Sequence, residues 1–249
     1  MVSLCMKRLS IIIPCFNEEE VLPHLLKRMA SVVDSLKNEW SVELLFVDDG
    51  SSDNTPAILD DFAKKNKFVK VLHHKKNMNL GAALRTGIKE ASGDVIVTND
   101  SDCTYPPEEI PLLLSHLVEG VDMVTASPYH PKGGVENVPA YRLFLSKSVS
   151  GLYRAVTKSN IHTFTSLFRA YRAPLAKSIN FRYNDFLGVT ELLIYPLLSG
   201  KVVREYPTVL RVRKYGSSKI KILKIIRNHL KFLWYIMRNK KKLSRGVHA

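Results

Sequence analysis

The sequence has 249 residues, of which 45% are hydrophobic and 24% charged, with 12 glycines, 12 prolines and three cysteines. This composition excludes a disordered tract, a collagen-like repeat and a small scaffold held by disulfides. Residues 1–200 carry 22 basic and 22 acidic side chains, whereas residues 201–249 carry 15 basic side chains and one acid, so the net charge of +14 comes entirely from the last fifth of the chain.

Five short apolar runs in the first half have the length and composition of strands that are buried on both faces of a parallel sheet. They are Leu9–Pro14, Val42–Asp48, Val69–Leu72, Asp94–Thr98 and Met123–Ser127. Because helical stretches separate them, the pattern predicts βαβ units and a doubly wound, mostly parallel α/β sheet. The segment Pro128–Pro139 is rich in proline and glycine, and we expect it to be a loop over one sheet edge.

Helix start signals lie between the predicted strands. Asn17, with Glu20 three residues later, predicts a capping box before a helix over Val21–Leu36. The segments Asp53–Pro56 and Pro106–Glu108 each place proline where the first turn of a helix tolerates it. These signals support the alternation of strands and helices.

Polar clusters follow three of the predicted strands. They are Asn17-Glu18, Asp48–Ser51 and Asp100–Asp102. Ligands of such sheets bind beyond the carboxyl ends of the strands, so we expect the clusters to line one crevice. Asp100 and Asp102 make a hard oxygen site for Mg²⁺ or Mn²⁺, whose other ligands would be phosphate and water. Since the sequence has neither a Walker loop nor a GxGxxG motif, these features favour a sugar nucleotide as the ligand.

Several ordered segments resemble family-2 glycosyltransferases of GT-A fold. They are Ile12–Glu19, Val47–Thr55, Gly81–Gly87, Asp100–Asp102 and Pro106–Glu108. Two later segments, Thr165–Arg172 and Arg213–Lys219, are similar to the branch that transfers mannose or glucose to dolichyl or polyprenyl phosphate. The resemblance covers roughly residues 9–220 and implies an inverting, metal-dependent hexosyltransferase that uses a GDP- or UDP-hexose.

The resemblance also implies roles for individual residues. The nucleotide sugar would be held by Pro14, Phe16, Glu18, Asp48, Asp49 and Asp100, and the Mg²⁺ or Mn²⁺ ion by Asp100 and Asp102. The lipid phosphate would be held by Arg142, Ser146 and Lys219, and the catalytic set would be Asp102, Arg142, Arg169 and Arg213.

The sequence departs from the family pattern at three places. Thr104 stands where the family often has a glutamine two residues after the second aspartate. The usual Gly-Ser-Arg-Tyr is Ala126–Tyr129, which lacks the arginine, and the usual Asp-x-Thr-Ser-Gly-Phe-Arg has Thr163 and Leu167 in place of the aspartate and the glycine.

The chemistry leaves two acceptors open. A phosphate monoester is already ionised near neutral pH and needs no general base, whereas a sugar or lipid hydroxyl does. Asp185 and Glu191 are the only acids between residues 137 and 204, where this fold usually places a base. A catalytically silent scaffold that binds a membrane or a partner is the third reading. We expect His73 and His74 to be loop residues rather than metal ligands.

The basic tail predicts a polyanionic partner at one end of the molecule. We divide the chain into a catalytic domain, 1–218, and an amphipathic helix and tail, 219–249. The predicted polar stripe of this helix is Lys221, Lys224, Asn228, Lys231, Tyr235 and Arg238. The wide apolar face opposite the stripe favours a membrane surface over nucleic acid, although a helix packed on the enzyme body fits the pattern too.

The expected location follows from the same features. No apolar stretch approaches the roughly 20 residues of a membrane span, and the apolar run near residue 10 is too short for a signal peptide. We therefore expect a peripheral protein at the cytosolic face of a membrane, with a separate membrane subunit as an alternative partner.

Overall fold

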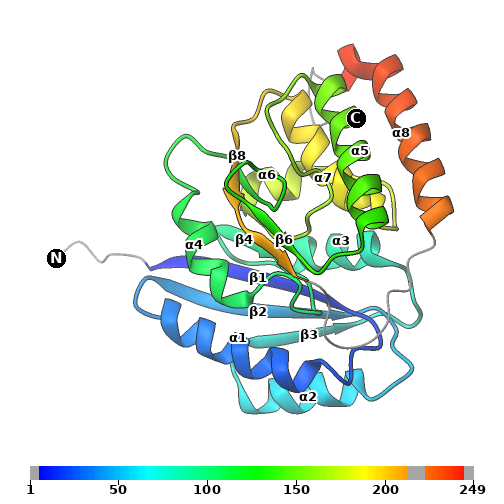
Figure 1. Cartoon of the computed structure of the whole chain (residues 1–249). Helices are drawn as coiled ribbons and strands as arrows, with labels where there is room; N and C mark the ends of the chain where they lie inside the picture. The colour runs from blue at the N-terminus through cyan, green and yellow to red at the C-terminus, as the bar shows by residue number, and fades with distance from the viewer. Residues whose placement is uncertain (1–5, 212–221, 244–249) are drawn as a thin grey trace.

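The computed structural model describes residues 6–211 and 222–243, which form an α/β fold with helices on both faces of a central sheet (Figure 1). Within these residues, the central sheet has seven strands in the order β3-β2-β1-β4-β7-β5-β8. All run parallel except β7, which is antiparallel to both neighbours. The strands are β1 (Lys7–Cys15), β2 (Trp40–Asp48), β3 (Val69–His73), β4 (Val95–Thr98), β5 (Met123–Ser127), β7 (Arg169–Arg172) and β8 (Val203–Pro207). The predicted doubly wound, mostly parallel sheet is confirmed.

Helices cover both faces of this sheet. One face carries α1 (Leu22–Leu36), α2 (Thr55–Lys65), a 3₁₀ turn (Pro107–Glu109) and α4 (Ile110–Ser115). The other carries α3 (Leu80–Glu90), α6 (Ala173–Ser178) and α7 (Leu187–Leu198), outside which α5 (Ala140–Thr157) and α8 (Ile222–Leu243) lie side by side (Figure 1). The sheet therefore separates two hydrophobic cores.

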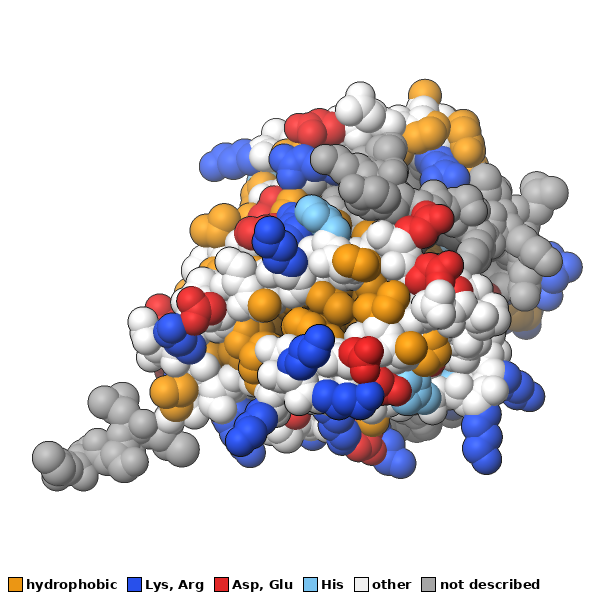
Figure 2. Space-filling view, turned by 90° about the horizontal axis from the view of Figure 1, so that it is seen from below, with side chains coloured by type: hydrophobic (Ala, Val, Ile, Leu, Met, Phe, Trp, Pro, Cys, Tyr) orange, Lys and Arg blue, Asp and Glu red, His pale blue; other side chains and the backbone are white. Residues whose placement is uncertain are grey.

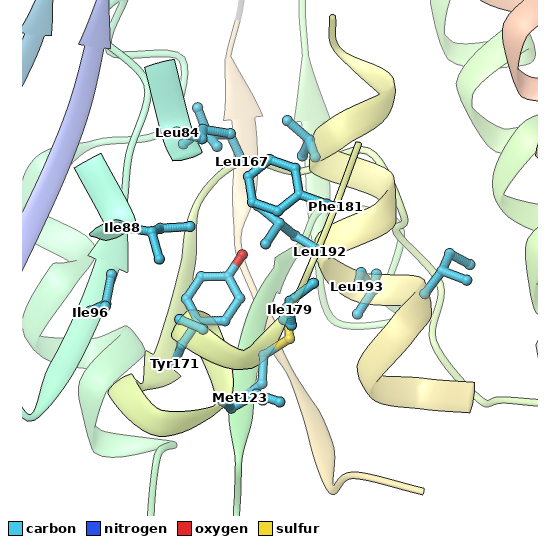
Figure 3. Packing of buried hydrophobic residues seen from close by; sticks show 14 of the residues in the cluster. Leu84, Ile88, Ile96, Met123, Leu167, Tyr171, Ile179, Phe181, Leu192 and Leu193 are labelled. Atoms are coloured by element: carbon cyan, nitrogen blue, oxygen red, sulfur yellow. The ribbon is translucent and has the colours of Figure 1, made fainter. Parts of the chain in front are cut away.

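The continuous apolar strands reflect this burial on both faces. Ile11 and Ile13 pack on the α1 side of the sheet and Ile12 on the α3 side, and all three are fully buried. Figure 3 shows the core on the α3 side, where Leu84 of α3 and Leu192 of α7 enclose side chains of the sheet. Burial of such side chains contributes about 1.5–3 kcal/mol each relative to exposure, which makes these cores the main source of stability.

The start of α1 differs from the prediction. No side chain caps the helix, whose N-cap position is Val21. Asn17 instead adopts a left-handed conformation with φ of 53°, and its side-chain oxygen accepts a hydrogen bond from the backbone N–H of Ser52 at 2.8 Å. The capping box is therefore wrong, because Asn17 joins the loops after β1 and β2. The proline signals of α2 and of the 3₁₀ turn are confirmed.

The segment Pro128–Pro139 contains more structure than the predicted loop. A short strand, β6 (Gly134–Glu136), pairs in parallel with β9 (Val209–Arg211) to form a second, two-stranded sheet. A strand of three residues that begins at the second of two adjacent glycines carries no periodic signal, so the pattern alone could not reveal it.

Helix α8 packs on the enzyme body through one face. Phe232 and Ile236 are fully buried against α5 and α7, and His229 is 2% exposed. The predicted polar stripe is corrected at two positions, because Asn228 donates a hydrogen bond to Asp185 at 2.8 Å and the ring of Tyr235 stacks on that of Phe232. The expectation that this helix packs on the enzyme body is confirmed for this face, whereas binding of its exposed face to a membrane stays a prediction. The domain division at residue 218 lies outside the described residues and stays a prediction.

The surface charge is uneven. Basic and acidic side chains are interspersed on the face seen from below (Figure 2), in keeping with the balanced charge of residues 1–200. By contrast, α8 carries basic residues and no acid. None of the helices in the described part of the chain combines the length and the apolar character needed to cross a bilayer.

A buried histidine makes the docking of α8 sensitive to acid. Nδ1 of His229 lies 2.9 Å from the Tyr153 hydroxyl of α5, and burial lowers the pKa of His229 to about 4 from an ordinary 6.5, against the opposing charge of Asp185. As the pH falls from about 6.5 to about 4, the unfolded chain binds a proton there and the folded chain does not. The free energy of unfolding should therefore fall, by on the order of 3 kcal/mol at most.

Urea denaturation across this pH range measures the effect. His229→Gln, which cannot titrate, should flatten the profile relative to the wild type. An identical loss of stability in both proteins would contradict the assignment.

Candidate active site

The carboxyl ends of three neighbouring strands bring the predicted polar clusters together. β1 lies between β2 and β4, and the pairing extends past the strand ends, where Asp49 N–H donates to Cys15 O at 2.8 Å and Asn99 N–H donates to Ile12 O at 3.0 Å. Asn17 N–H donates to Ser51 Oγ at 2.9 Å. The loops after β1, β2 and β4 therefore share one edge of the sheet, as the sequence predicted.

The paired carboxylates Asp100 and Asp102 stand at this edge. Both are partly exposed, whereas the preceding Asn99 is fully buried. Cys103 has φ of 57°, and Oδ1 of Asp102 accepts the backbone N–H of Thr104 at 3.0 Å, which fixes the turn. No cluster of three His, Cys, Asp or Glu side chains suited to a metal occurs among the described residues. Two carboxylates fit an Mg²⁺ or Mn²⁺ ion that takes its other ligands from a diphosphate and water.

The predicted base-pocket residues surround the end of β1. Pro14 is buried within the strand, and Phe16 and Glu18 are partly exposed in the loop that follows. The backbone N–H of Glu18 donates to Thr55 Oγ1 at 2.8 Å, which holds this loop against the start of α2. These three positions therefore lie at the shared edge, beside the loop that follows β2.

Asp48 and Asp49 are almost fully buried, and both make hydrogen bonds that sequence reasoning missed. Asp48 accepts from Ser51 N–H at 3.0 Å and lies 2.9 Å from Nδ1 of His73, the last residue of β3. Nδ1 of His74 lies 2.7 Å from Oδ1 of Asp49. The prediction that these two histidines are loop residues is wrong for His73, which ends β3, and holds for His74, which follows the strand. The contact that each makes with one aspartate of the candidate site was not predicted.

Most hydrogen bonds from the segment Gly81–Gly87 to other elements are with the loop before α7 rather than with the residues of the candidate site. Gly81 N–H donates to Asn184 O at 2.6 Å, and a Cβ at position 81 would lie 2.2 Å from Tyr183 O. Arg85 donates to Phe181 O at 2.7 Å with its guanidinium over the Phe181 ring. The start of α3 therefore clasps the loop before α7, and glycine is required there for close approach.

The two candidate general bases are engaged in structural hydrogen bonds. Oε2 of Glu191 accepts the backbone N–H groups of Arg182 and Tyr183 at 2.9 and 2.7 Å, and Oε1 accepts the Tyr195 hydroxyl at 2.8 Å. Burial raises the pKa of Glu191, against the lowering effect of these hydrogen bonds. Asp185 accepts from Leu187 N–H and from Asn228. Both oxygens of each carboxylate therefore already accept hydrogen bonds within the protein.

Helix α5 carries two of the residues expected to hold the lipid phosphate. Arg142 is exposed, and its Nε donates to the Tyr141 hydroxyl at 3.2 Å. Ser146, one turn further, lies with its hydroxyl 2.9 Å from that of Thr165. Arg213 and Lys219 fall outside the described residues.

Arg169 differs from the expectation. Its side chain is fully buried in β7, where Nε donates to Thr125 Oγ1 at 3.2 Å and the two terminal nitrogens donate to Phe164 O and Val189 O. An arginine whose nitrogens all donate to buried protein oxygens cannot also reach a phosphate in this arrangement. We therefore assign Arg169 a structural role in place of the implied phosphate contact.

Replacing Arg169 by methionine should accordingly destabilise the fold. The change removes the donors that Arg169 supplies to Thr125 Oγ1, Phe164 O and Val189 O, at a cost of about 1–3 kcal/mol for each buried oxygen left unpaired. Urea denaturation should show this loss, while nucleotide affinity per folded molecule stays near that of the wild type. Normal stability with weakened nucleotide binding would restore the phosphate-contact role.

Two of the departures from the family pattern touch each other. The Thr163 hydroxyl lies 2.8 Å from Ser127 Oγ and accepts Tyr129 N–H at 3.3 Å, on either side of Pro128. The missing arginine and the missing aspartate therefore belong to adjacent positions, so their joint loss leaves the local charge balanced.

Comparison with known proteins agrees with this geometry. Residues 10–179 match the family model described as glycosyl transferase family 2. Over 96% of its length the chain is 34% identical to a dolichol-phosphate mannosyltransferase of Pyrococcus furiosus, and over 88% it is 29% identical to an undecaprenyl-phosphate 4-deoxy-4-formamido-L-arabinose transferase of Salmonella choleraesuis. The chain spans 66% and 64% of the lengths of these relatives.

Solved structures show the same fold. The glucosyl-3-phosphoglycerate synthase of Mycobacterium tuberculosis, in complex with Mn²⁺, uridine diphosphate and phosphoglyceric acid, superposes with a TM-score of 0.68 at 19% identity, covering 92% of this chain and 77% of the other. The same synthase with Mg²⁺ and uridine diphosphate gives a TM-score of 0.68. This likeness confirms the expected GT-A fold.

Proposed function

The chain belongs to glycosyltransferase family 2, and on that premise we propose that it transfers a hexose, mannose or glucose, from a GDP- or UDP-hexose to a polyprenyl or dolichyl phosphate with inversion. The observation that carries the proposal is the state of the two candidate bases. Glu191 and Asp185 already accept hydrogen bonds from backbone and side-chain donors, which favours an acceptor that needs no base. A phosphate monoester, ionised near neutral pH, meets this requirement.

The donor binds at the shared edge of the sheet. Phe16, Glu18 and Asp49 hold the nucleoside, and Asp100 and Asp102 hold an Mg²⁺ or Mn²⁺ ion together with the diphosphate. When bound, the ion offsets the negative charge that develops on the departing nucleoside diphosphate. The protein residues orient the sugar for attack from the opposite side, which inverts the anomeric centre.

The acceptor approaches along α5, which places Arg142 and Ser146 on one face because they are four residues apart. Tyr141, Phe144 and Leu152 of this helix are 53%, 70% and 47% exposed, and Leu230, Trp234 and Met237 of α8 are 55%, 54% and 58% exposed. Basic residues accompany them on both helices, and neither helix contains an acid. We propose that this exposed α5/α8 surface lies on anionic lipid at the cytosolic face of a membrane.

A donor and acceptor screen tests the proposed function. GDP- and UDP-hexoses are supplied with a short polyprenyl phosphate and Mg²⁺ or Mn²⁺, and the lipid product is measured. Transfer from one donor supports the proposal. Transfer only to a sugar or lipid hydroxyl would favour the alternative acceptor, and nucleotide-sugar binding without turnover on any acceptor would favour a silent scaffold.

Arg142→Ala should raise the KM for the polyprenyl phosphate about 10- to 100-fold, because a charge-assisted contact to phosphate contributes about 1.5–3 kcal/mol. The donor KM should change little. Lys65→Ala is the control, since Lys65 is an exposed basic residue of α2, on the opposite face of the sheet. Equal increases in both KM values would contradict the assigned role.

A further inference from the structure

His74 links Asp49 of the candidate site to helix α3. It follows β3 directly, and its side chain is 10% exposed. Nδ1 lies 2.7 Å from Oδ1 of Asp49, and Nε2 lies 2.9 Å from the Thr86 hydroxyl in α3. The ring is therefore held at both nitrogens.

The same carboxylate oxygen receives a second donor. The backbone N–H of Met78 donates to Oδ1 of Asp49 at 2.9 Å. Gly50, with φ of 70°, allows this approach, because a Cβ there would lie 2.4 Å from the carbonyl carbon of Lys76. The segment 74–78 thus closes on Asp49 from one side. Two donors on a single oxygen fix the rotation of the carboxyl group.

The other oxygen is left for a ligand. Among the described residues no hydrogen bond is made to Oδ2 of Asp49, although the side chain is only 4% exposed. A carboxylate oxygen in a fixed direction accepts well from the N–H groups of a nucleobase or from ribose hydroxyls. Such preorganisation lowers the entropy cost of binding, since the acceptor does not have to be ordered by the ligand.

We propose that His74 is a positioning residue for the nucleoside diphosphate, acting through Asp49. This inference rests on the proposed function. With Asp49 ionised, Nδ1 carries the hydrogen that it donates to Oδ1, and Nε2 accepts from the Thr86 hydroxyl. The Asp49 carboxylate therefore sets the tautomer, and the Thr86 hydroxyl holds the ring at its other nitrogen. This gives one residue of the segment Gly81–Gly87 a part in donor binding besides its place in the scaffold.

Two substitutions at one position separate this role from simple packing. Asparagine places its amide nitrogen where Nδ1 of histidine lies, so His74→Asn keeps a donor for Asp49. Glutamine places its amide group near the position of Nε2, so His74→Gln keeps the contact to Thr86 and loses the one to Asp49. Thr86→Val removes the hydroxyl and provides a further variant that leaves the histidine in place.

Calorimetric titration of GDP and of UDP, with Mg²⁺ and without acceptor, gives the test. His74→Gln should weaken binding of the preferred nucleotide about 10-fold, and Thr86→Val less, while His74→Asn should stay within about threefold of the wild type. In transfer assays His74→Gln should raise the donor KM and leave the acceptor KM unchanged.

If all three variants bind the nucleotide with the affinity of the wild type, this inference is overturned and the proposed function still stands. The same holds if His74→Asn and His74→Gln weaken binding equally. A wild-type protein that binds neither GDP nor UDP would overturn both.

Discussion

Replacing Asp102 by asparagine should abolish sugar transfer while the protein remains folded. The amide keeps an oxygen that can accept Thr104 N–H, so the turn that follows Asp100 is preserved. It removes one of the two negative charges that would hold the divalent ion at this site. Loss of the ion removes the main stabilisation of the leaving diphosphate, and we expect turnover to fall by at least about 10²–10³-fold.

Radiolabelled transfer with saturating donor and acceptor measures this loss, and circular dichroism checks the fold. Asp122→Asn is the matched control, because Asp122 likewise accepts a backbone N–H, from Val202, but precedes β5 and so lies at the opposite edge of the sheet. Full activity of Asp102→Asn, or of the wild type in EDTA, would contradict the metal assignment.

The second large effect is expected on the exposed face of α8. Trp234 and Met237 are more than half exposed, and the guanidinium of Arg238 lies 4.0 Å from the Trp234 ring centroid. The double variant Trp234→Ser/Met237→Ser should weaken binding to anionic vesicles by about 10²- to 10⁴-fold, since each of the two large apolar side chains contributes roughly 1.5–3 kcal/mol when buried in lipid. Stability should hardly change, because the buried residues of α8 are untouched.

Leu112→Ser provides the control for this experiment, since Leu112 of α4 is also 55% exposed but lies on the opposite face of the sheet. Wild-type binding should weaken with salt, because basic side chains at a lipid surface are screened over about 8 Å at physiological ionic strength. A wild-type protein that ignores anionic vesicles at low salt would contradict the membrane assignment and favour a separate membrane subunit on this surface.

The sequence reveals the parts of the fold that depend on repeated burial. The runs at Leu9–Pro14 and Val42–Asp48 predicted β1 and β2 correctly, because a strand that is buried on both faces is a continuous apolar run in the sequence. Strand β6 was not predicted, because three residues are too few to show an alternation of apolar and polar side chains. The capping box is wrong for a different reason: the side chain of Asn17 accepts a hydrogen bond from Ser52 in the loop after the neighbouring strand β2, which local spacing cannot predict.

The candidate site was only partly predictable. Asp49, Asp100 and Asp102 could be placed because parallel strands bring their carboxyl ends to one edge. Arg169 could not, because its sequence position says nothing about the carbonyl groups of Phe164 and Val189 that surround it. The hydrogen bonds of His74 could not be predicted, since its partners Asp49 and Thr86 lie 25 and 12 residues away in the chain. The signal that could have predicted this role is a histidine at the end of a strand whose neighbouring strand ends in aspartates.

Whether the acceptor group is a phosphate or a hydroxyl can be tested with a matched pair of lipids. Polyprenyl phosphate and the corresponding polyprenol, of equal chain length, are offered separately with the same donor and metal, and the glycosylated lipid is quantified. Because Glu191 and Asp185 are held by structural hydrogen bonds, we expect transfer to the phosphate and none to the alcohol. Comparable transfer to the polyprenol would show that a base acts in this enzyme, and would contradict a phosphate acceptor.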